Sequence, residues 1–237
     1  MTIRTERRND ALSKERIVQA AIDILDGEGE GALTFRALAR RLATGSGAIY
    51  WHIADKDALL AAATDDVVTQ AMSGGAMSGG SMSDGGGDGV EPREAIRVIA
   101  LGIFDAIDAH PWVGAQFSRA PWQPAMLRVF EAIGGRLWAL GVPEAAWFNA
   151  WSALVTYIFG AATQNAANAR LQAPGTDRSA ALADIAGGWA RLDPAQYPFL
   201  RQVAPQLGAH DDREQFLAGV DLILAGIGTV KGKSPPA

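Results

Sequence analysis

The chain has 237 residues, of which 49% are hydrophobic and 20% are charged, so it holds enough apolar material for a packed core. It contains no cysteine, which excludes disulfides, thiol nucleophiles and cysteine-ligated zinc. It has no apolar run long enough to span a membrane, and its polar, charged start is unlike a secretory signal. We therefore expect a cytoplasmic protein with one large domain or two small ones.

The net charge of −5 disfavours a nucleic-acid partner only when the charge is taken as a whole. Basic and acidic side chains are equally frequent in the first 60 residues, so the remainder of the chain carries the acidic excess. Residues 33–52 contain arginines but no acid, and the extreme N-terminus is a second basic place. Such focused charge suffices for phosphate contacts, although a solvated helix face is an equally good interpretation. The arginines in the two places are Arg4, Arg7, Arg8, Arg36, Arg40 and Arg41.

Four helices are predicted in the first part of the chain. Ser13 is a suitable N-cap for the first helix, whose apolar positions recur at helical spacing up to a glycine-rich end. Thr34 caps a short second helix, and a small-residue turn at 43–45 leads into a third short helix over 46–53. Asp55 then caps the fourth helix.

Helical periodicity also dominates the remainder of the chain. Residues 73–90 are rich in glycine and serine, which predicts a flexible loop, and Pro92 opens the next helix at a position that tolerates proline. No strand-type alternation occurs, so the fold class is all-α. We expect a small N-terminal three-helix unit, residues 1–57, joined to a larger C-terminal helical bundle, residues 58–230. The later helices are expected at 92–109, 113–119, 127–140, 143–169, 179–190 and 212–227.

Two short helices joined by a tight turn over residues 34–53 form the pattern of a helix-turn-helix motif. In this motif the second helix enters the major groove of DNA. Residues 45–48 are small, which allows a close approach to the duplex. Tyr50 and His52 can donate hydrogen bonds to phosphates or bases, and Lys56 is placed for a phosphate.

The segment LTFRALARRLATGSGAIYWHIADKDALLAA, residues 33–62, resembles the signature of the TetR family of transcriptional regulators. Its Tyr-Trp-His run is typical of the tetracycline-repressor-like branch. The region around Gly114 to Pro121 is similar to the pocket loop of that branch, and residues 216–226 are similar to its last dimer helix. The matching residues of the signature are Leu33, Thr34, Arg36, Leu38, Ala39, Ile49, Tyr50, Trp51, His52, Ile53, Lys56, Leu59 and Leu60.

The resemblance implies a set of DNA contacts. Phosphate contacts are expected from Thr34, Tyr50, Trp51 and Lys56. Arg36 and His52 are expected at the groove, and Ser46, Gly47 and Ala48 occupy the base-reading positions. Because glycine and alanine offer no polar side chain there, the operator sequence stays open and DNA shape can contribute to recognition. Trp51 has an alternative role, as a half-buried residue that packs against Ile17 and Leu59.

Six of the seven tryptophans lie beyond residue 100, and indole rings suit a cavity for planar or hydrophobic ligands. The branch also implies a metal–drug complex as effector, but Ser118 and Gln164 stand where that complex needs a histidine and an acid. We therefore expect a metal-free effector and no cofactor. By position, the resemblance implies the effector contacts Met72, Phe104, Arg119, Trp122, Trp151 and Gln164.

The resemblance implies a homodimer in which helices 143–169 and 212–227 of two subunits form a four-helix bundle. The predicted function is a repressor that leaves a palindromic operator when a small hydrophobic or aromatic effector binds. An activator is a further possibility within the family. The chain lacks a nucleophile–base pair, a metal-spaced carboxylate pair and a phosphate loop, so an enzyme is not expected. The alternative is a helical ligand-binding protein or enzyme that does not bind DNA.

Overall fold

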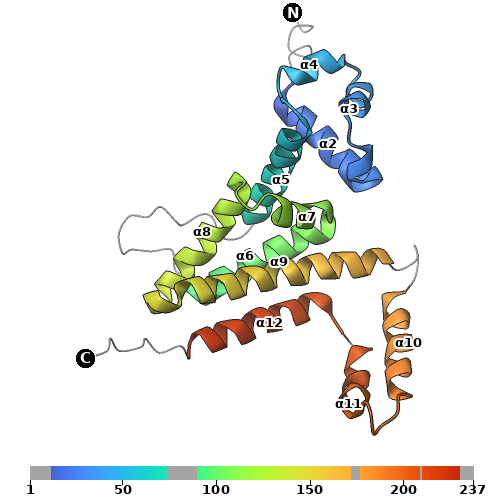
Figure 1. Ribbon diagram of the computed structural model, residues 1–237, viewed down its shortest axis with the longest axis vertical. Coiled ribbons are helices and arrows are strands. Elements are labelled where there is room, and N and C mark those ends of the chain that lie inside the picture. Colours follow the sequence, from blue (N-terminus) through green and yellow to red (C-terminus); the bar gives the residue numbers. More distant parts are fainter. Residues whose placement is uncertain (1–11, 74–89, 172–176, 209, 230–237) are drawn as a thin grey trace, which may run out of the picture.

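The computed structural model describes residues 12–73, 90–171, 177–208 and 210–229, and every regular element in these ranges is a helix. The expected all-α fold is confirmed. In Figure 1 a small unit of short helices stands above a bundle of longer helices, and α5 connects the two. No helix in the described ranges is both long enough and apolar enough to cross a membrane.

The upper unit consists of α2 (Lys14–Glu28), the 3-10 turn η1 (Glu30–Ala32), α3 (Phe35–Arg41) and α4 (Ser46–Tyr50). We call it the helix-turn-helix unit, residues 14–53. The predicted caps are confirmed. The hydroxyl of Ser13 accepts from the backbone N–H of Arg16 at 3.3 Å, and the hydroxyl of Thr34 accepts from that of Ala37 at 3.1 Å. The main departure is α4, which ends at Tyr50 instead of Ile53. Residues 51–52 form a turn, in which the N–H groups of His52 and Ile53 both donate to Ile49 O, at 2.9 and 3.1 Å.

Helix α5 (Lys56–Ser73) leads from the helix-turn-helix unit into the lower bundle. Asp55 caps it as predicted and accepts from the backbone N–H of Ala58 at 2.8 Å. Its upper part packs against α2 and its lower part against α6 (Pro92–Ala109). The predicted glycine-rich loop lies almost wholly outside the described residues, at 74–89, and Ser73 belongs to α5.

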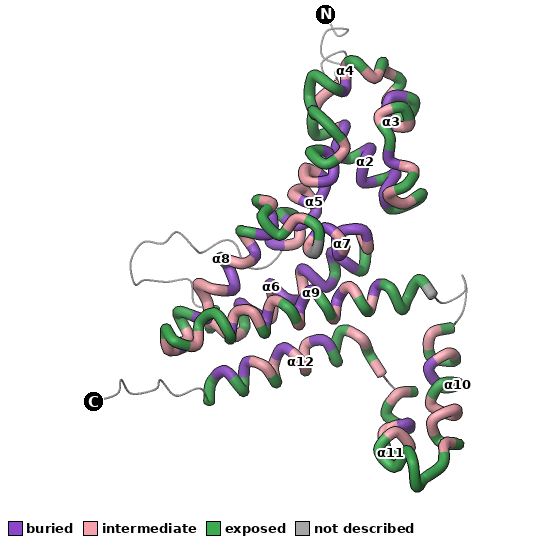
Figure 2. The backbone as a smooth tube through the Cα atoms, viewed as in Figure 1, coloured by how far each residue is buried: buried purple, intermediate pink, exposed green. Residues whose placement is uncertain are grey.

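The lower bundle, here called the sensor bundle, is built around α6, which contacts α5, α7, α8, α9 and α12. Isoleucines at helical spacing fill its buried face, and Figure 2 shows the purple buried stripe along the central helices. Its isoleucines are Ile96, Ile99, Ile103 and Ile107. The surrounding elements are α7 (Trp112–Arg119), α8 (Pro124–Ala139), η2 (Glu144–Ala146), α9 (Trp147–Leu171) and α12 (Asp212–Ile227).

Helices α10 (Arg178–Ala190) and α11 (Pro198–Leu207) form a hairpin that lies to one side of the sensor bundle. They pack mainly against each other, and several large apolar side chains of the hairpin stay exposed. The sequence analysis missed α11, because Pro205 lies inside it and proline normally breaks a helix interior. The exposed apolar residues of the hairpin are Ile185, Tyr197 and Phe199.

Candidate DNA interface and sensor bundle

The turn between α3 and α4 is held by backbone hydrogen bonds. The N–H of Leu42 donates to Leu38 O at 2.9 Å and that of Thr44 donates to Ala39 O at 3.0 Å. Ala43 adopts a φ of +50°, which reverses the chain direction within one residue. Leu38 and Ile49 are fully buried, so they pack the inner sides of the two helices into one core and leave the opposite sides in solvent.

The outer side of the helix-turn-helix unit carries the residues predicted to contact DNA. Thr34, Arg36 and Gly47 are exposed, whereas Ser46 and Ala48 are half-buried. A Cβ added at Gly47 would meet no atom within 4 Å, which shows that the chain is open to solvent here. Nothing in the described structure blocks a close approach at this position.

Trp51 is 90% exposed, and its neighbour His52 is exposed as well. The alternative prediction, that Trp51 packs against Ile17 and Leu59, is therefore wrong. Tyr50 instead stacks face to face on Phe35 from α3, with ring centroids 4.3 Å apart and planes within 5°. Tyr50 is thus held against α3, whereas the ring of Trp51 projects into solvent just after the end of α4.

Lys56, which was predicted to contact a phosphate, already has a hydrogen-bond partner within the protein. Its ammonium donates to the backbone carbonyl of Glu30 at 2.8 Å, which ties the start of α5 to η1. An ammonium has three donors, so two remain for another acceptor.

The arginines of α3 differ in their surroundings. Arg41 pairs with Asp23 on α2 at 2.8 Å, and this hydrogen bond is the main cause that lowers the pKa of the Asp23 carboxyl. Arg36 and Arg40 form no ion pair with any described residue. The predicted basic N-terminus, with Arg4, Arg7 and Arg8, lies outside the described residues.

The structure does not bring the six predicted effector residues into one cavity. Met72 and Phe104 lie in the apolar core, where the ring of Phe104 meets that of Phe216 at 4.7 Å. Trp151 is half-buried beside Phe130. The remaining three predicted residues, Arg119, Trp122 and Gln164, are exposed.

The three exposed residues lie at different places in the fold. Arg119 pairs with Glu30 of η1 at 2.6 Å, which draws its side chain out of the sensor bundle. Trp122 is 71% exposed and lies in the turn between α7 and α8. Gln164 is exposed on α9 and lies on a different side of that helix from the buried residues Leu154 and Ile158.

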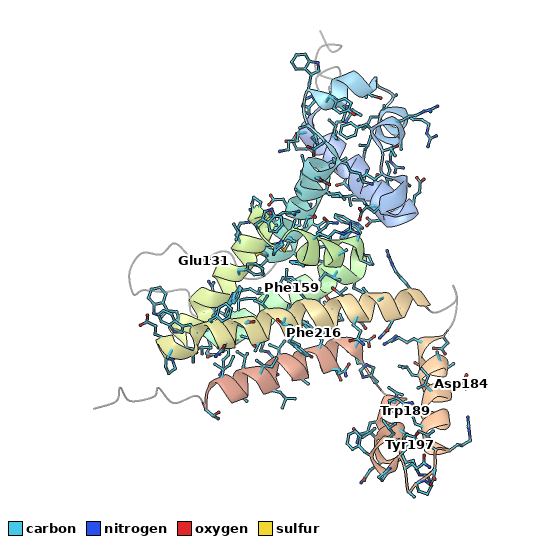
Figure 3. All side chains as sticks on the ribbon, viewed as in Figure 1. Glu131, Phe159, Asp184, Trp189, Tyr197 and Phe216 are labelled. Carbon is cyan, nitrogen blue, oxygen red and sulfur yellow. The ribbon has the colours of Figure 1, made fainter. Side chains whose placement is uncertain are left out.

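The sequence analysis missed a buried polar residue in the sensor bundle. Gln116 on α7 is only 3% exposed, and its side-chain Nε2 has no hydrogen-bond partner among the described atoms. Phe117 follows it and lies against Phe159 of α9, with ring centroids 3.5 Å apart, and Figure 3 labels Phe159 near the middle of α9. A buried amide without a partner is costly and marks a place where an acceptor from another molecule would be stabilised.

The start of α7 approaches α9 closely. A Cβ added at Gly114 would come within 2.6 Å of the Thr163 hydroxyl, so only glycine fits at this contact. The available signal for Gln116 was its place just after the pocket-like pair Gly114 and Ala115, but burial could not be inferred from spacing alone. Among the described residues, no group of three or more histidine and carboxylate side chains could hold a metal ion.

Polar contacts tie the sensor bundle to the helix-turn-helix unit. Asp26, in the last turn of α2, accepts from the indole N–H of Trp112 at 2.8 Å and lies 2.9 Å from Nδ1 of His110. The pair of Arg119 and Glu30 adds a second link at the other end of α7. Both ends of α7 are therefore fastened to the α2–η1 region.

Comparisons with known proteins agree with this architecture. Residues 17–63 match the family described as bacterial regulatory proteins, tetR family, and residues 89–231 match the tetracyclin repressor-like C-terminal domain. An HTH-type transcriptional regulator from Saccharopolyspora erythraea is 29% identical over 227 residues, which is 95% of this chain and 89% of that protein.

Solved structures have the same fold. The transcriptional regulator SCO7222, a TetR from Streptomyces coelicolor, is 51% identical with a TM-score of 0.80, over 92% of this chain and 98% of that chain. The TetR family protein ActR from Streptomyces coelicolor, in complex with actinorhodin, is 24% identical with a TM-score of 0.70, over 91% and 95% of the two chains. Members of this family are transcriptional regulators and not enzymes. The chain thus belongs to the TetR family, as a DNA-binding transcriptional regulator with a ligand-binding C-terminal domain.

Proposed function

We propose that this regulator is a repressor that binds a palindromic operator as a homodimer and leaves it when a small hydrophobic or aromatic effector binds. The observation that carries the proposal is the 90% exposure of Trp51 beside the exposed Tyr50 and His52. Three consecutive exposed aromatic side chains form a patch of the kind that marks an interaction surface, and Arg36 and Arg40 supply positive charge on the adjacent helix. Residues 1–57 form the DNA-binding domain in this proposal and residues 58–230 bind the effector and the second subunit.

The proposed DNA contacts follow from these positions. Small residues at the start of α4 let its backbone reach base edges, while the aromatic and hydroxyl side chains contact phosphates. Lys56 keeps its bond to Glu30 and uses a remaining donor. The proposed contacts are Thr34, Arg36, Ser46, Gly47, Ala48, Tyr50, Trp51, His52 and Lys56.

A second copy of the chain would cover the outer stripes of α9 and α12. The α9 stripe consists of small or polar residues at helical spacing, and Leu222 of α12 is a large exposed apolar residue. Small side chains let helices from two subunits approach closely. The exposed apolar residues of the α10–α11 hairpin also need a cover that this chain does not provide. The α9 stripe consists of Asn149, Ala153, Thr156, Gly160 and Gln164.

We propose that the effector binds inside the sensor bundle next to Gln116. Its unpartnered Nε2 would donate to a carbonyl or phenolic oxygen, while Phe117 and Phe159 would stack on an aromatic ring. Of the six predicted contacts, Met72 and Phe104 are buried in the same bundle. ActR, a TetR family protein with the same fold, was solved in complex with actinorhodin.

Effector binding would act through α7. An effector wedged beside Gln116 displaces α7, and the links from both ends of α7 to Asp26 and Glu30 pass the movement to α2 and η1. In a dimer this changes the spacing of the two α4 helices, which must match successive turns of DNA about 34–36 Å apart.

The test is a gel-shift titration with the promoter of the protein's own gene, at stated salt, together with a transcription assay. Repression predicts binding to a palindrome without effector, a salt slope of about −0.9 per phosphate contact, and less transcript when the protein is added. More transcript would identify an activator. Absence of binding at low salt would contradict the proposal and favour a ligand-binding protein without a DNA role.

A further inference from the structure

A cleft between the second half of α8 and the first turns of α9 forms a candidate site separate from the bundle interior. It encloses about 270 Å³ and lies at the end of the sensor bundle that is remote from the helix-turn-helix unit (Figure 1). We call it the aromatic cleft. Its lining consists of Glu131, Gly134, Gly135, Leu137, Trp138, Trp147, Phe148 and Trp151.

The rings of the aromatic cleft are held in place by the protein itself. The indole N–H of Trp147 donates to Val142 O at 2.6 Å, and that of Trp151 donates to Phe130 O at 3.2 Å. Trp138 lies 5.7 Å from Trp147 between ring centroids. Because the donors of Trp147 and Trp151 are already used, these two rings offer π faces rather than hydrogen bonds to a ligand.

The aromatic rings lie close together, and one side of the cleft that they form is open to solvent. Trp138 is 60% exposed, and Phe148, 6.0 Å from Trp151, is more exposed still. Gly134 and Gly135 leave the α8 wall without side chains. The cleft therefore has aromatic walls, a bare backbone floor and an open side through which a small ligand can pass.

Charge distinguishes this cleft from an ordinary apolar groove. Among the described residues that line it, Glu131 on α8, labelled in Figure 3, is the one charged side chain, and these residues include no lysine or arginine. A carboxylate and several π faces favour a positive charge. Neutral apolar ligands would gain nothing from Glu131, and anions would be repelled by it.

We propose that the aromatic cleft binds a small organic cation with N-methyl groups, such as a quaternary ammonium headgroup. The methyl groups, which share the positive charge, would lie against Trp138, Trp147 and Trp151, and the Glu131 carboxylate would face the cation from α8. The volume suits a headgroup rather than a whole drug-sized molecule.

The proposal does not depend on the effector site or on DNA binding. Phe148 and Trp151 lie on the side of α9 that faces α8, whereas Asn149 and Ala153 belong to the outer stripe that we assign to the second subunit. Dimerisation through that stripe therefore leaves the aromatic cleft open. A chain that failed to bind any promoter could still bind the cation.

The test compares choline with its uncharged isostere 3,3-dimethylbutan-1-ol on the full-length chain, by calorimetry and by saturation transfer to the methyl protons. We expect choline to bind at least about fivefold more tightly than the alcohol. Glu131→Gln should remove that preference, and Trp138→Leu should weaken binding of choline by about fivefold or more. Both residues are exposed, so both variants should fold, which a thermal melt confirms.

Glu214→Gln, a change of an exposed carboxylate on α12, is the matched control and should bind choline as the wild type does. Equal affinity for choline and the alcohol would overturn the cation assignment. So would choline binding that survives Glu131→Gln unchanged. Absence of methyl saturation transfer with both compounds would overturn the site itself.

Discussion

The indole N–H of Trp112, in the first turn of α7, donates to Oδ1 of Asp26 in the last turn of α2 at 2.8 Å. The two residues belong to different parts of the protein, because Asp26 lies in the helix-turn-helix unit and Trp112 in the sensor bundle. His110 lies against the same carboxylate. One carboxylate thus joins the end of α6, the start of α7 and the end of α2, which makes it a route by which a movement of α7 reaches the DNA-binding helices.

Removal of this hydrogen bond should loosen α2. Trp112→Phe keeps an aromatic ring but loses the donor, and a hydrogen bond to a carboxylate is worth about 1.5–3 kcal/mol. We expect backbone amides of α2 to exchange at least about fivefold faster with deuterium, measured by mass spectrometry. Trp147→Phe is the control, because it also loses an indole donor but lies at the start of α9, and it should leave deuterium exchange in α2 unchanged. Equal exchange in both variants would remove Asp26 from the coupling route.

Trp51 should matter for DNA and not for folding. Because its side chain is 90% exposed, Trp51→Ala should change the free energy of unfolding by less than about 0.5 kcal/mol. We expect operator affinity in the gel shift to fall by about tenfold or more, since a truncated aromatic anchor costs more than about 1 kcal/mol. Trp122→Ala, at a 71% exposed position in the sensor bundle, is the control and should retain operator affinity. Similar losses in both variants would argue against Trp51 as a contact.

Replacement of Gln116 should make the protein more stable and weaken its binding of the effector. Gln116→Leu removes a buried side-chain N–H group that has no partner among the described atoms, and such a group costs about 1–3 kcal/mol, so the free energy of unfolding in urea should rise. The same variant should lose the thermal stabilisation that an effector from a library of aromatic compounds confers on the wild type. Gln202→Leu, at an exposed position on α11, should alter neither quantity. If Gln116→Leu were less stable than the wild type, the amide would have a partner in solution.

Gly219 should be indispensable where α12 meets α9. A Cβ at this position would overlap the hydroxyl of Tyr157, which donates to Phe216 O at 3.1 Å. Gly219→Ala should therefore lower the free energy of unfolding by about 1–3 kcal/mol through overpacking. Gly226→Ala, in the same helix, meets no atom within 4 Å and should raise it by up to about 1 kcal/mol. The free energies of unfolding of both variants are measured in urea. An unchanged value for Gly219→Ala would contradict the close contact between Gly219 and Tyr157.

The ion pair of Asp23 and Arg41 should make the stability of the helix-turn-helix unit depend on pH in the acid range. Arg41 lowers the pKa of Asp23 below its ordinary 3.8, so the stabilisation is complete above that pH and is lost as the pH falls through the lowered value. Both side chains are more than 40% exposed, so Asp23→Asn should cost less than about 1 kcal/mol at pH 7. Urea unfolding should show this difference shrink below pH 3.8. Asp184→Asn, at an exposed position of α10, is the control and should leave the free energy of unfolding at pH 7 unchanged. A difference that grew in acid would have the wrong sign.

Local signals in the sequence were sufficient for most of the helices and for the starts of the three capped ones. Ser13, Thr34 and Asp55 cap helices as predicted, because a capping oxygen needs only the backbone N–H groups of the next three residues. The helix-turn-helix pattern and the all-α fold follow from periodicity within short windows. The tail of α4 and the whole of α11 were misjudged, since the end of a helix and a proline in its last turn depend on what surrounds them.

By itself, the sequence determined that this chain is helical, that it carries a helix-turn-helix motif and that it resembles the TetR family, because those features are written in neighbouring residues. Only the tertiary structure decided that Trp51 projects into solvent, that Nε2 of Gln116 has no partner among the described atoms and that Glu131 lines one cleft with aromatic rings from α8 and α9. These facts depend on how helices that are distant in the chain pack against one another. Packing is a property of the whole set of contacts, and no single window of sequence contains it.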